Sequence, residues 1–320
     1  MARMLMDKMH LRQQLISRVG VPMQDETVVA DNLQTRYLAV GKGKPVLLLH
    51  GATAGGAISW HPLFKPISTR FRVIAPDCPG YGESAIEQVV HDVPFFVHWL
   101  DSFLDKLQVE KIAVIGASQG GSIAMRYALY RPQRVHKLVL IASAGLCSRL
   151  RYSVLLFALG SLLLDLCPAP VLERAFERAL IFQSETNNPT FDLYRRYNCE
   201  IANLPAFQSI SWLQRIFHIN RPLTRDELSQ IGQPTLLLWS AKDRLFPTPI
   251  AYTAAKVIPN AQLHIVPNTG HAAFLEDPKQ FLAAIMPFLA GKLPKQKLGE
   301  PAKSLFWRKD HGASISPIHL

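Results

Sequence analysis

Short, uninterrupted runs of apolar residues recur along the chain and alternate with segments that have the spacing of helices. A strand with one face in water would alternate apolar and polar residues, whereas an unbroken apolar run fits a strand covered on both faces. Such strands belong to mostly parallel sheets with helices packed on each side. We therefore expect an α/β fold with a mostly parallel, doubly wound sheet, whose strands lie at residues 45–49, 71–76, 112–115, 137–142, 235–239 and 262–266.

The alternation stops between about residues 146 and 232, where helix formers are frequent and no convincing core strand occurs. We interpret 146–232 as a helical cap inserted between two strands, and 34–145 with 233–291 as one discontinuous core. Residues 1–33 are expected to form an N-terminal helix and extension, and 292–320 a basic, mostly disordered tail. With 320 residues, 48% of them hydrophobic, the chain can bury one large core.

One predicted strand leads directly into a serine between glycines, in the sequence Gly116-Ala-Ser-Gln-Gly120. The residues before it predict a strand and residues 122–130 predict a helix, so the serine lies in a sharp strand-to-helix turn. In this G-x-S-x-G spacing the serine has a strained backbone, and the glycines at 116 and 120 remove side chains that would collide. Ser118 is therefore a candidate nucleophile, although an incidental serine in a tight glycine turn would have the same sequence.

A serine hydroxyl needs a base to accept its proton and an acid to orient that base. His271 follows the last expected strand, and Asp243 follows the strand before it. Both would lie on loops at the carboxyl edge of the sheet, where ligands bind in open α/β folds. The order Ser118, Asp243, His271 is that of an α/β-hydrolase triad, so we predict these three residues as catalytic.

Each residue has another interpretation when it is taken alone. His271 would also fit a surface loop, and Asp243 would also fit a cap of the helix that follows it. The segment after the strand 137–142 contains no carboxylate, which favours Asp243 as the acid. Asp77 is better explained as the start of a turn.

Acyl transfer also needs donors directed at the oxyanion that forms on the attacked carbonyl. The backbone N–H of Gln119, directly after the nucleophile, is one predicted donor. The other is expected on the loop after the strand 45–49, from the N–H of Ala52, with that of Thr53 as the alternative. His50 is expected to form a hydrogen bond within this loop and to take no part in proton transfer.

The net charge of +11 is spread along the chain and is denser at its ends. No recognised nucleic-acid module accompanies it, so we expect no nucleic-acid partner. The four cysteines form neither a C-x-x-C pair nor a ligand cluster with histidine, so we expect no metal, no cofactor and reduced thiols in a cytoplasmic protein.

The N-terminus lacks the continuous apolar core of a secretion signal, because charged residues interrupt it. The apolar segment 154–166 is too short to span a bilayer and contains Asp165, so we expect a cap helix that faces a substrate cavity or lipid. Peripheral membrane contact through the cap or the basic termini stays open.

Four segments resemble the α/β-hydrolase superfamily over about residues 34–291, apart from the insertion: LLLHGATAGG, DCPGYGES, GASQGG, and the pair WSAKDRLFP with NTGHAAFLEDP. The resemblance implies the α/β-hydrolase fold and a cap similar to that of lipases, esterases and carbon–carbon bond hydrolases. It argues against epoxide hydrolases and haloalkane dehalogenases, which have an aspartate where this chain has Ser118. Carbon–carbon bond hydrolases keep the serine, but they commonly have a tryptophan where this chain has Ala272-Ala-Phe274.

These features predict a serine hydrolase that cleaves a carboxylic ester of a small apolar or aromatic substrate through an acyl-enzyme. Two alternatives stay open. One is carbon–carbon bond hydrolysis or acyl transfer to an acceptor other than water. The other is a non-catalytic ligand-binding protein on a hydrolase fold.

Overall fold

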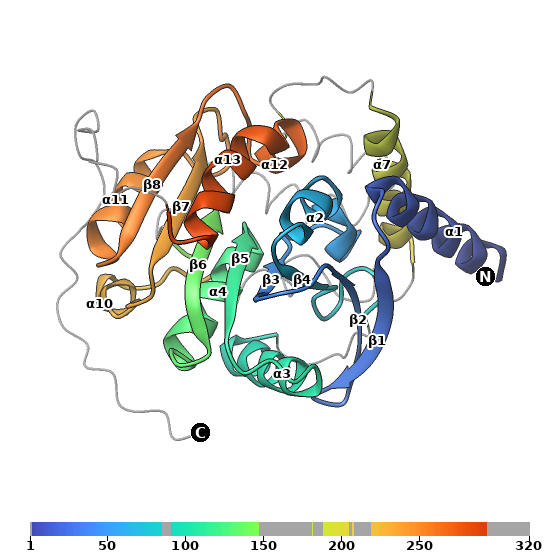
Figure 1. Ribbon diagram of the computed structural model, residues 1–320, viewed down its shortest axis with the longest axis horizontal. Coiled ribbons are helices and arrows are strands. Elements are labelled where there is room, and N and C mark those ends of the chain that lie inside the picture. The colour runs from blue at the N-terminus through green and yellow to red at the C-terminus, as the bar shows by residue number, and fades with distance from the viewer. Residues whose placement is uncertain are drawn as a thin grey trace.

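A single eight-stranded sheet forms the centre of the computed structural model, in the strand order β1-β2-β4-β3-β5-β6-β7-β8 (Figure 1). The structure describes residues 2–84, 91–146, 188–204 and 219–292 with residues 181 and 207, and of residues 2–8 only the backbone. All neighbours from β4 to β8 are parallel, whereas β2 pairs antiparallel with both β1 and β4. The mostly parallel sheet expected from the sequence is confirmed.

The strands are β1 (Gln24–Ala30), β2 (Leu33–Val40), β3 (Pro45–Leu49), β4 (Arg72–Pro76), β5 (Ile112–Ala117), β6 (Val135–Ile141), β7 (Thr235–Ser240) and β8 (Ala261–Val266). The helices are α1 (Ala2–Val19), the 3-10 helix η1 (Gly56–Trp60), α2 (His61–Ser68), α3 (Val93–Lys106), α4 (Gln119–Tyr130), α7 (Pro189–Ala202), α10 (Arg225–Ser229), α11 (Pro249–Val257), α12 (Ala273–Glu276) and α13 (Pro278–Leu289).

The six strands predicted from apolar runs are all present, within two residues at either end. The two N-terminal strands, β1 and β2, were not predicted. β1 lies at the edge of the sheet and most of its residues are exposed or half-buried, so its sequence contains polar residues that a search for unbroken apolar runs passes over. The sheet thus begins within residues 1–33, so the expected core boundary at residue 34 is wrong.

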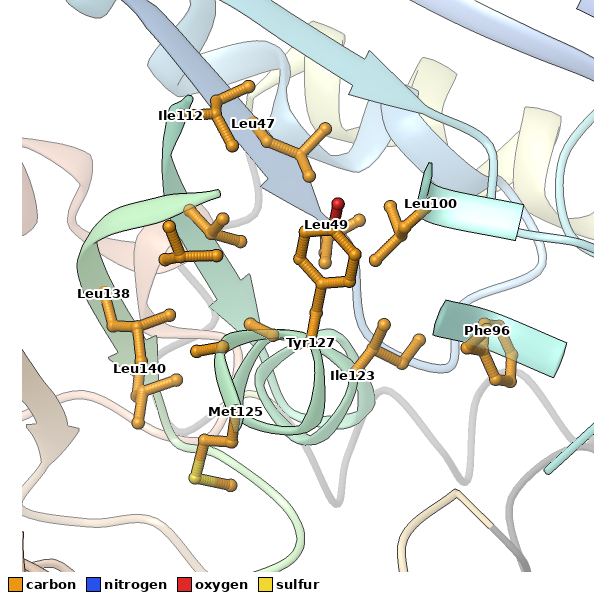
Figure 2. Packing of buried hydrophobic residues seen from close by; sticks show 14 of the residues in the cluster. Leu47, Leu49, Phe96, Leu100, Ile112, Ile123, Met125, Tyr127, Leu138 and Leu140 are labelled. Atoms are coloured by element: carbon orange, nitrogen blue, oxygen red, sulfur yellow. The ribbon is translucent and has the colours of Figure 1, made fainter. Parts of the chain in front are cut away.

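Successive residues of the central strands point to opposite faces of the sheet, and helices cover each face. On one face the strand residues pack against α3, α4 and α11, and on the other against α1, α2 and α13. Figure 2 shows part of the first face, where residues from three strands meet α3 and α4: Leu47, Leu49, Ile112, Leu138 and Leu140 from the strands, with Phe96, Leu100, Ile123, Met125 and Tyr127 from the helices. This packing holds the strands that end at the candidate site.

In the described part of the chain between β6 and β7, the insertion contains the helices α7 and α10. α7 packs against α1 on the side of β1 and β2 (Figure 1). The apolar segment 154–166 and the tail from 293 to 320 lie outside the described residues. Among the helices that are described, none combines the length and the apolarity required to cross a bilayer.

Candidate active site

Ser118 lies between the end of β5 and the start of α4, at the carboxyl edge of the sheet. Its backbone has φ +50° and ψ −115°, a conformation that non-glycine residues rarely adopt. Two of its backbone hydrogen bonds tie it to the end of β6 and the turn that follows. The Ser118 N–H donates to the carbonyl of Ile141 at 2.9 Å, and the N–H of Ala144 donates to the Ser118 carbonyl at 2.9 Å. The turn at the end of β6 therefore supports the strained serine.

The glycines on both sides of Ser118 stand where a side chain has no room. A Cβ at Gly116 would collide with the backbone of Gly120, and a Cβ at Gly120 would collide with the carbonyl of Leu49. Gly51 faces the serine itself, since a Cβ there would lie 3.3 Å from the Ser118 Cβ. Glycine thus lets α4 begin directly against the end of β3 and lets the loop after β3 approach Ser118.

Asp243 and His271 are in contact, with 2.8 Å between Asp243 Oδ2 and His271 Nδ1. The other carboxylate oxygen, Oδ1, accepts hydrogen bonds from the N–H groups of Leu245 at 2.9 Å and Phe246 at 2.8 Å. Both side chains are buried. Because backbone donors hold Oδ1, the other carboxylate oxygen is directed at the imidazole. The imidazole ring also packs against the Phe246 ring in a T-shaped arrangement, with 5.1 Å between the ring centroids.

The loops that carry the acid and the histidine are tied together beyond their strands. The N–H of Ala241 donates to the carbonyl of Val266 at 2.9 Å, and the N–H of Lys242 donates to that of Thr269 at 3.1 Å. The N–H of Gly270 donates to Glu276 Oε1 at 2.8 Å. The first two bonds continue the parallel register of β7 and β8 and set the spacing of Asp243 and His271, and the third links the turn before His271 to α12.

The three predicted triad residues therefore follow β5, β7 and β8, whose carboxyl ends lie at one edge of the sheet. Asp243 and His271 are brought into direct contact. No hydrogen bond joins the Ser118 hydroxyl to His271 within the described part of the chain. Hydrogen bonds between a nucleophile and its base are often long in unliganded enzymes and shorten when substrate binds.

The loop after β3 makes a tight turn, in which the Thr53 N–H donates to the Gly51 carbonyl at 2.7 Å. The amide of Thr53, the alternative oxyanion donor, is thus already engaged. Ala52 lies at the centre of this turn, next to the glycine that faces Ser118. Of the two candidates, the geometry favours the N–H of Ala52.

Gln119, whose N–H is the other candidate donor, is buried at the start of α4. Its side chain accepts a hydrogen bond from the Tyr81 hydroxyl at 2.8 Å. The Tyr81 ring packs against His50 with a centroid distance of 5.3 Å. The side chain of Gln119 thus points to a structural partner, which agrees with a role of its backbone alone.

His50 forms the hydrogen bond expected within its loop. Its Nδ1 lies 2.6 Å from the carbonyl of Gly51, and its Nε2 lies 2.9 Å from the backbone nitrogen of Cys78. A backbone N–H only donates, so Nε2 is the acceptor and Nδ1 carries the proton that is donated to Gly51. Burial lowers the pKa of His50 to about 4, so the ring is neutral at pH 7.

The stability of the protein is therefore expected to fall in mild acid. His50 binds a proton near pH 6.5 in the unfolded chain but only at about pH 4 in the folded protein, so its contribution is complete above pH 6.5 and is lost between pH 6.5 and 4. The loss reaches at most roughly 3 kcal/mol. Denaturant unfolding measured across this range should show a smaller pH dependence for His50→Gln. His98 is an exposed histidine of α3, so His98→Gln should leave the pH dependence of stability unchanged. An equal effect of both variants would contradict the assignment of this pH dependence to His50.

Asp77 starts the turn after β4, as the sequence indicated: its Oδ2 accepts from the N–H of Glu83 at 2.9 Å, and its carbonyl accepts from the Ser84 hydroxyl at 2.6 Å. It also has a role that was not predicted. The carboxylate is fully buried, its Oδ1 accepts from the N–H of Ala57 at 2.6 Å, and its Oδ2 forms an ion pair with Arg12 of α1 at 3.1 Å. Asp77 thereby joins the N-terminal helix to the start of η1.

No residue of α7 was predicted to lie at the site, yet this helix contacts the loop after β3. Asn198 Oδ1 lies 2.6 Å from the Gly55 nitrogen and 2.8 Å from the Thr53 hydroxyl, which is itself 2.7 Å from the Tyr194 hydroxyl. Asparagine and tyrosine are ordinary residues on a helix surface, so their positions in the sequence gave no signal of this contact.

Residues 44–278, most of the chain, match the family model described as the alpha/beta hydrolase fold. The chain belongs to this family. Among its relatives, 2-hydroxy-6-oxo-6-(2'-aminophenyl)hexa-2,4-dienoic acid hydrolase of Metapseudomonas resinovorans is 25% identical, over 82% of this chain and 90% of the relative. The pimeloyl-(acyl-carrier protein) methyl ester esterase of Aeromonas hydrophila is 27% identical, over 78% of this chain and 96% of the relative.

A solved structure, the carboxylesterase CesB of Bacillus subtilis, aligns with 91% of this α/β hydrolase and with the whole of that enzyme, at a TM-score of 0.79 and 23% identity. At this identity the likeness shows the fold alone. The chain thus belongs to a hydrolase family, and its relatives include both an esterase and a hydrolase of an oxo-dienoic acid.

Proposed function

We propose that the protein is a serine hydrolase that cleaves a carboxylic ester of a small apolar or aromatic substrate. The observation that carries the proposal is the hydrogen bond of 2.8 Å between Asp243 and His271, which follow strands of the same sheet edge as the serine in the strained turn. This is the constellation that converts a weakly nucleophilic hydroxyl into a strong one.

In the proposed reaction Ser118 Oγ attacks the ester carbonyl while His271 Nε2 accepts the hydroxyl proton. Asp243 accepts a hydrogen bond from the Nδ1–H of His271 without taking its proton, and so keeps Nε2 unprotonated and stabilises the imidazolium that forms. The N–H groups of Gln119 and Ala52 donate to the developing oxyanion. His271 then protonates the departing alcohol, and a water that it deprotonates releases the carboxylic acid and restores Ser118.

Carbon–carbon bond hydrolysis is the second candidate, because one relative is named for the hydrolysis of a 2-hydroxy-6-oxo-dienoic acid. The carbon chain of such an acid contains no ester bond, so its hydrolysis must cleave a carbon–carbon bond. The composition near His271 favours the ester. Carbon–carbon bond hydrolases commonly have a tryptophan shortly after the catalytic histidine, where this chain has Ala272-Ala-Phe274. The Phe274 ring stacks on Trp60 with 4.5 Å between centroids.

A fluorophosphonate probe tests the nucleophile. The wild-type protein is expected to become labelled at Ser118, as located by peptide mass spectrometry, because the probe reacts with activated serines. Ser118→Ala should remove all labelling, whereas Ser122→Ala, a buried serine of α4, should leave the site of labelling unchanged. Labelling that survives in Ser118→Ala would refute the assignment.

A substrate panel separates the candidate reactions. p-Nitrophenyl esters of graded chain length should be turned over, and a 2-hydroxy-6-oxo-dienoic acid should be hydrolysed far more slowly. The reverse ranking would favour carbon–carbon bond hydrolysis, and ester consumption that requires an added alcohol would favour acyl transfer. Tight binding of panel compounds without turnover would favour a ligand-binding protein.

A further inference from the structure

One face of α7, a helix of the insertion, is directed at the loop that carries the candidate oxyanion donor Ala52. Tyr194, Tyr197 and Asn198 have the i, i+3, i+4 spacing that places side chains on one face of a helix. This face lies directly against Gly55, where an added Cβ would be 3.1 Å from Asn198 Oδ1 and 3.3 Å from the Tyr194 ring. Helix and loop backbone are therefore in contact.

The hydrogen bonds between α7 and this loop have a defined direction. The backbone N–H of Gly55 only donates, so the atom of Asn198 that it meets at 2.6 Å is the amide oxygen. The same oxygen accepts a hydrogen bond from the Thr53 hydroxyl, with 2.8 Å between the two oxygens. Because the Thr53 hydroxyl proton is used in this bond, the Tyr194 hydroxyl donates to Thr53 across 2.7 Å. One side-chain oxygen of the insertion thus holds two points of the loop, one and three residues after Ala52.

A second connection links α7 to the far end of the same loop. The Tyr197 hydroxyl accepts from Arg12 at 3.1 Å, and Arg12 forms the buried ion pair with Asp77. Asp77 in turn accepts from the N–H of Ala57 at 2.6 Å. The segment from Thr53 to Ala57 is therefore held at its start and middle by Asn198, and at its end by a network that includes Tyr197.

We propose that Asn198 is a positioning residue, which sets the place of the Ala52 N–H relative to Ser118 through Thr53 and Gly55. The inference rests on the proposed function and deepens it. Asn198 belongs to the insertion, whereas Ala52, Gln119 and the triad belong to the core. The oxyanion site thus takes its correct shape only while α7 is docked on the loop, and the insertion acts on the chemical step.

The effect of removing this contact is expected on kcat. A misplaced donor weakens an interaction that matters most in the transition state, and displacements of about 1 Å can cost about 100-fold in rate. Asn198→Ala should therefore lower kcat about 10- to 100-fold with KM within about threefold. Asn198→Asp keeps an oxygen that accepts both bonds and should stay within about threefold of wild type in kcat.

The experiment measures kcat and KM for a p-nitrophenyl ester of the panel, per active site, with the sites counted by complete fluorophosphonate labelling. The inhibition constant of a trifluoromethyl ketone is measured beside them, because its reversible adduct with Ser118 places an oxyanion in the same hole. Asn203→Ala, the same substitution at the end of α7, is the matched control. Thr53→Val and Thr53→Ser provide a second pair, since only the valine variant lacks the hydroxyl that bonds Asn198.

The inference would be supported if kcat falls and ketone binding weakens in parallel in Asn198→Ala and Thr53→Val. The three other variants, Asn198→Asp, Thr53→Ser and Asn203→Ala, should then have kcat and inhibition constants near those of the wild type. Unchanged kcat per labelled site in Asn198→Ala would overturn it, even if the melting temperature falls, because the role would then be structural only. A wild-type protein that shows no Ser118-dependent labelling would overturn the proposed function and this inference with it.

Discussion

Asp243→Asn is expected to lower kcat for ester hydrolysis about 10⁴-fold while the fold stays intact. The asparagine oxygen would still accept the N–H groups of Leu245 and Phe246, so the new amide nitrogen would face His271. An amide N–H only donates, which forces His271 Nδ1 to be the acceptor and moves its proton to Nε2. A protonated Nε2 cannot accept the proton of Ser118.

Steady-state kinetics with a p-nitrophenyl ester, together with the rate of fluorophosphonate labelling, measures this loss. Circular dichroism and the melting temperature show whether the fold is kept. Asp226→Asn provides a matched control, since Asp226 is an exposed carboxylate in the first turn of α10. A decrease of less than tenfold for Asp243→Asn would mean that Asp243 does not determine the state of the base.

Arg12→Leu is expected to destabilise the protein by about 3–5 kcal/mol. Arg12 is 1% exposed and forms ion pairs with Asp77, which is fully buried, and with Asp25 at 3.1 Å. Asp25 would keep its second ion pair, with Arg36 at 2.8 Å. Asp77 would keep only neutral backbone donors, so a buried carboxylate would lose its counter-charge. The cost comes mainly from that stranded charge, because a pair of apolar residues in place of both ions is often neutral or stabilising.

Denaturant unfolding gives the change in the free energy of unfolding directly. The same substitution at Arg18, an exposed residue in the last turn of α1, serves as control and should change the free energy of unfolding by no more than about 0.5 kcal/mol. If Arg12→Leu and Arg18→Leu cost the same, the buried network does not anchor the N-terminal helix.

The part of the fold that could be predicted from the sequence is the part whose residues are buried on both faces. β3 and β5 consist almost wholly of apolar residues and were found as unbroken runs. β1 has the sequence QDETVVA and lies at the sheet edge, where one side is open to water, so its strand pattern is weak. The prediction therefore found the centre of the sheet and missed its N-terminal edge.

The candidate site also has residues that could be predicted from the sequence and residues that could not. Ser118, Asp243 and His271 could be named because each follows a recognisable strand, and the edge of a parallel sheet brings such positions together. The contacts of Asn198 and Arg12 could not be named, because they join segments far apart in the chain through single side chains. Periodicity indicates which face of a helix is buried, but it does not indicate which distant backbone group a polar residue on that face will bond.

The insertion between β6 and β7 also affects how the site comes into being during synthesis. β6 ends at Ile141 and its parallel neighbour β7 begins at Thr235, so this pairing must close a long stretch of chain before it gains any ladder bonds. The part of the core that carries Ser118 leaves the ribosome first, and the residues proposed to activate it, Asp243 and His271, are made later. A nascent or truncated chain that stops before β7 should therefore be unreactive toward the probe, and activity should appear only with the slow, non-local closure of the final two strands.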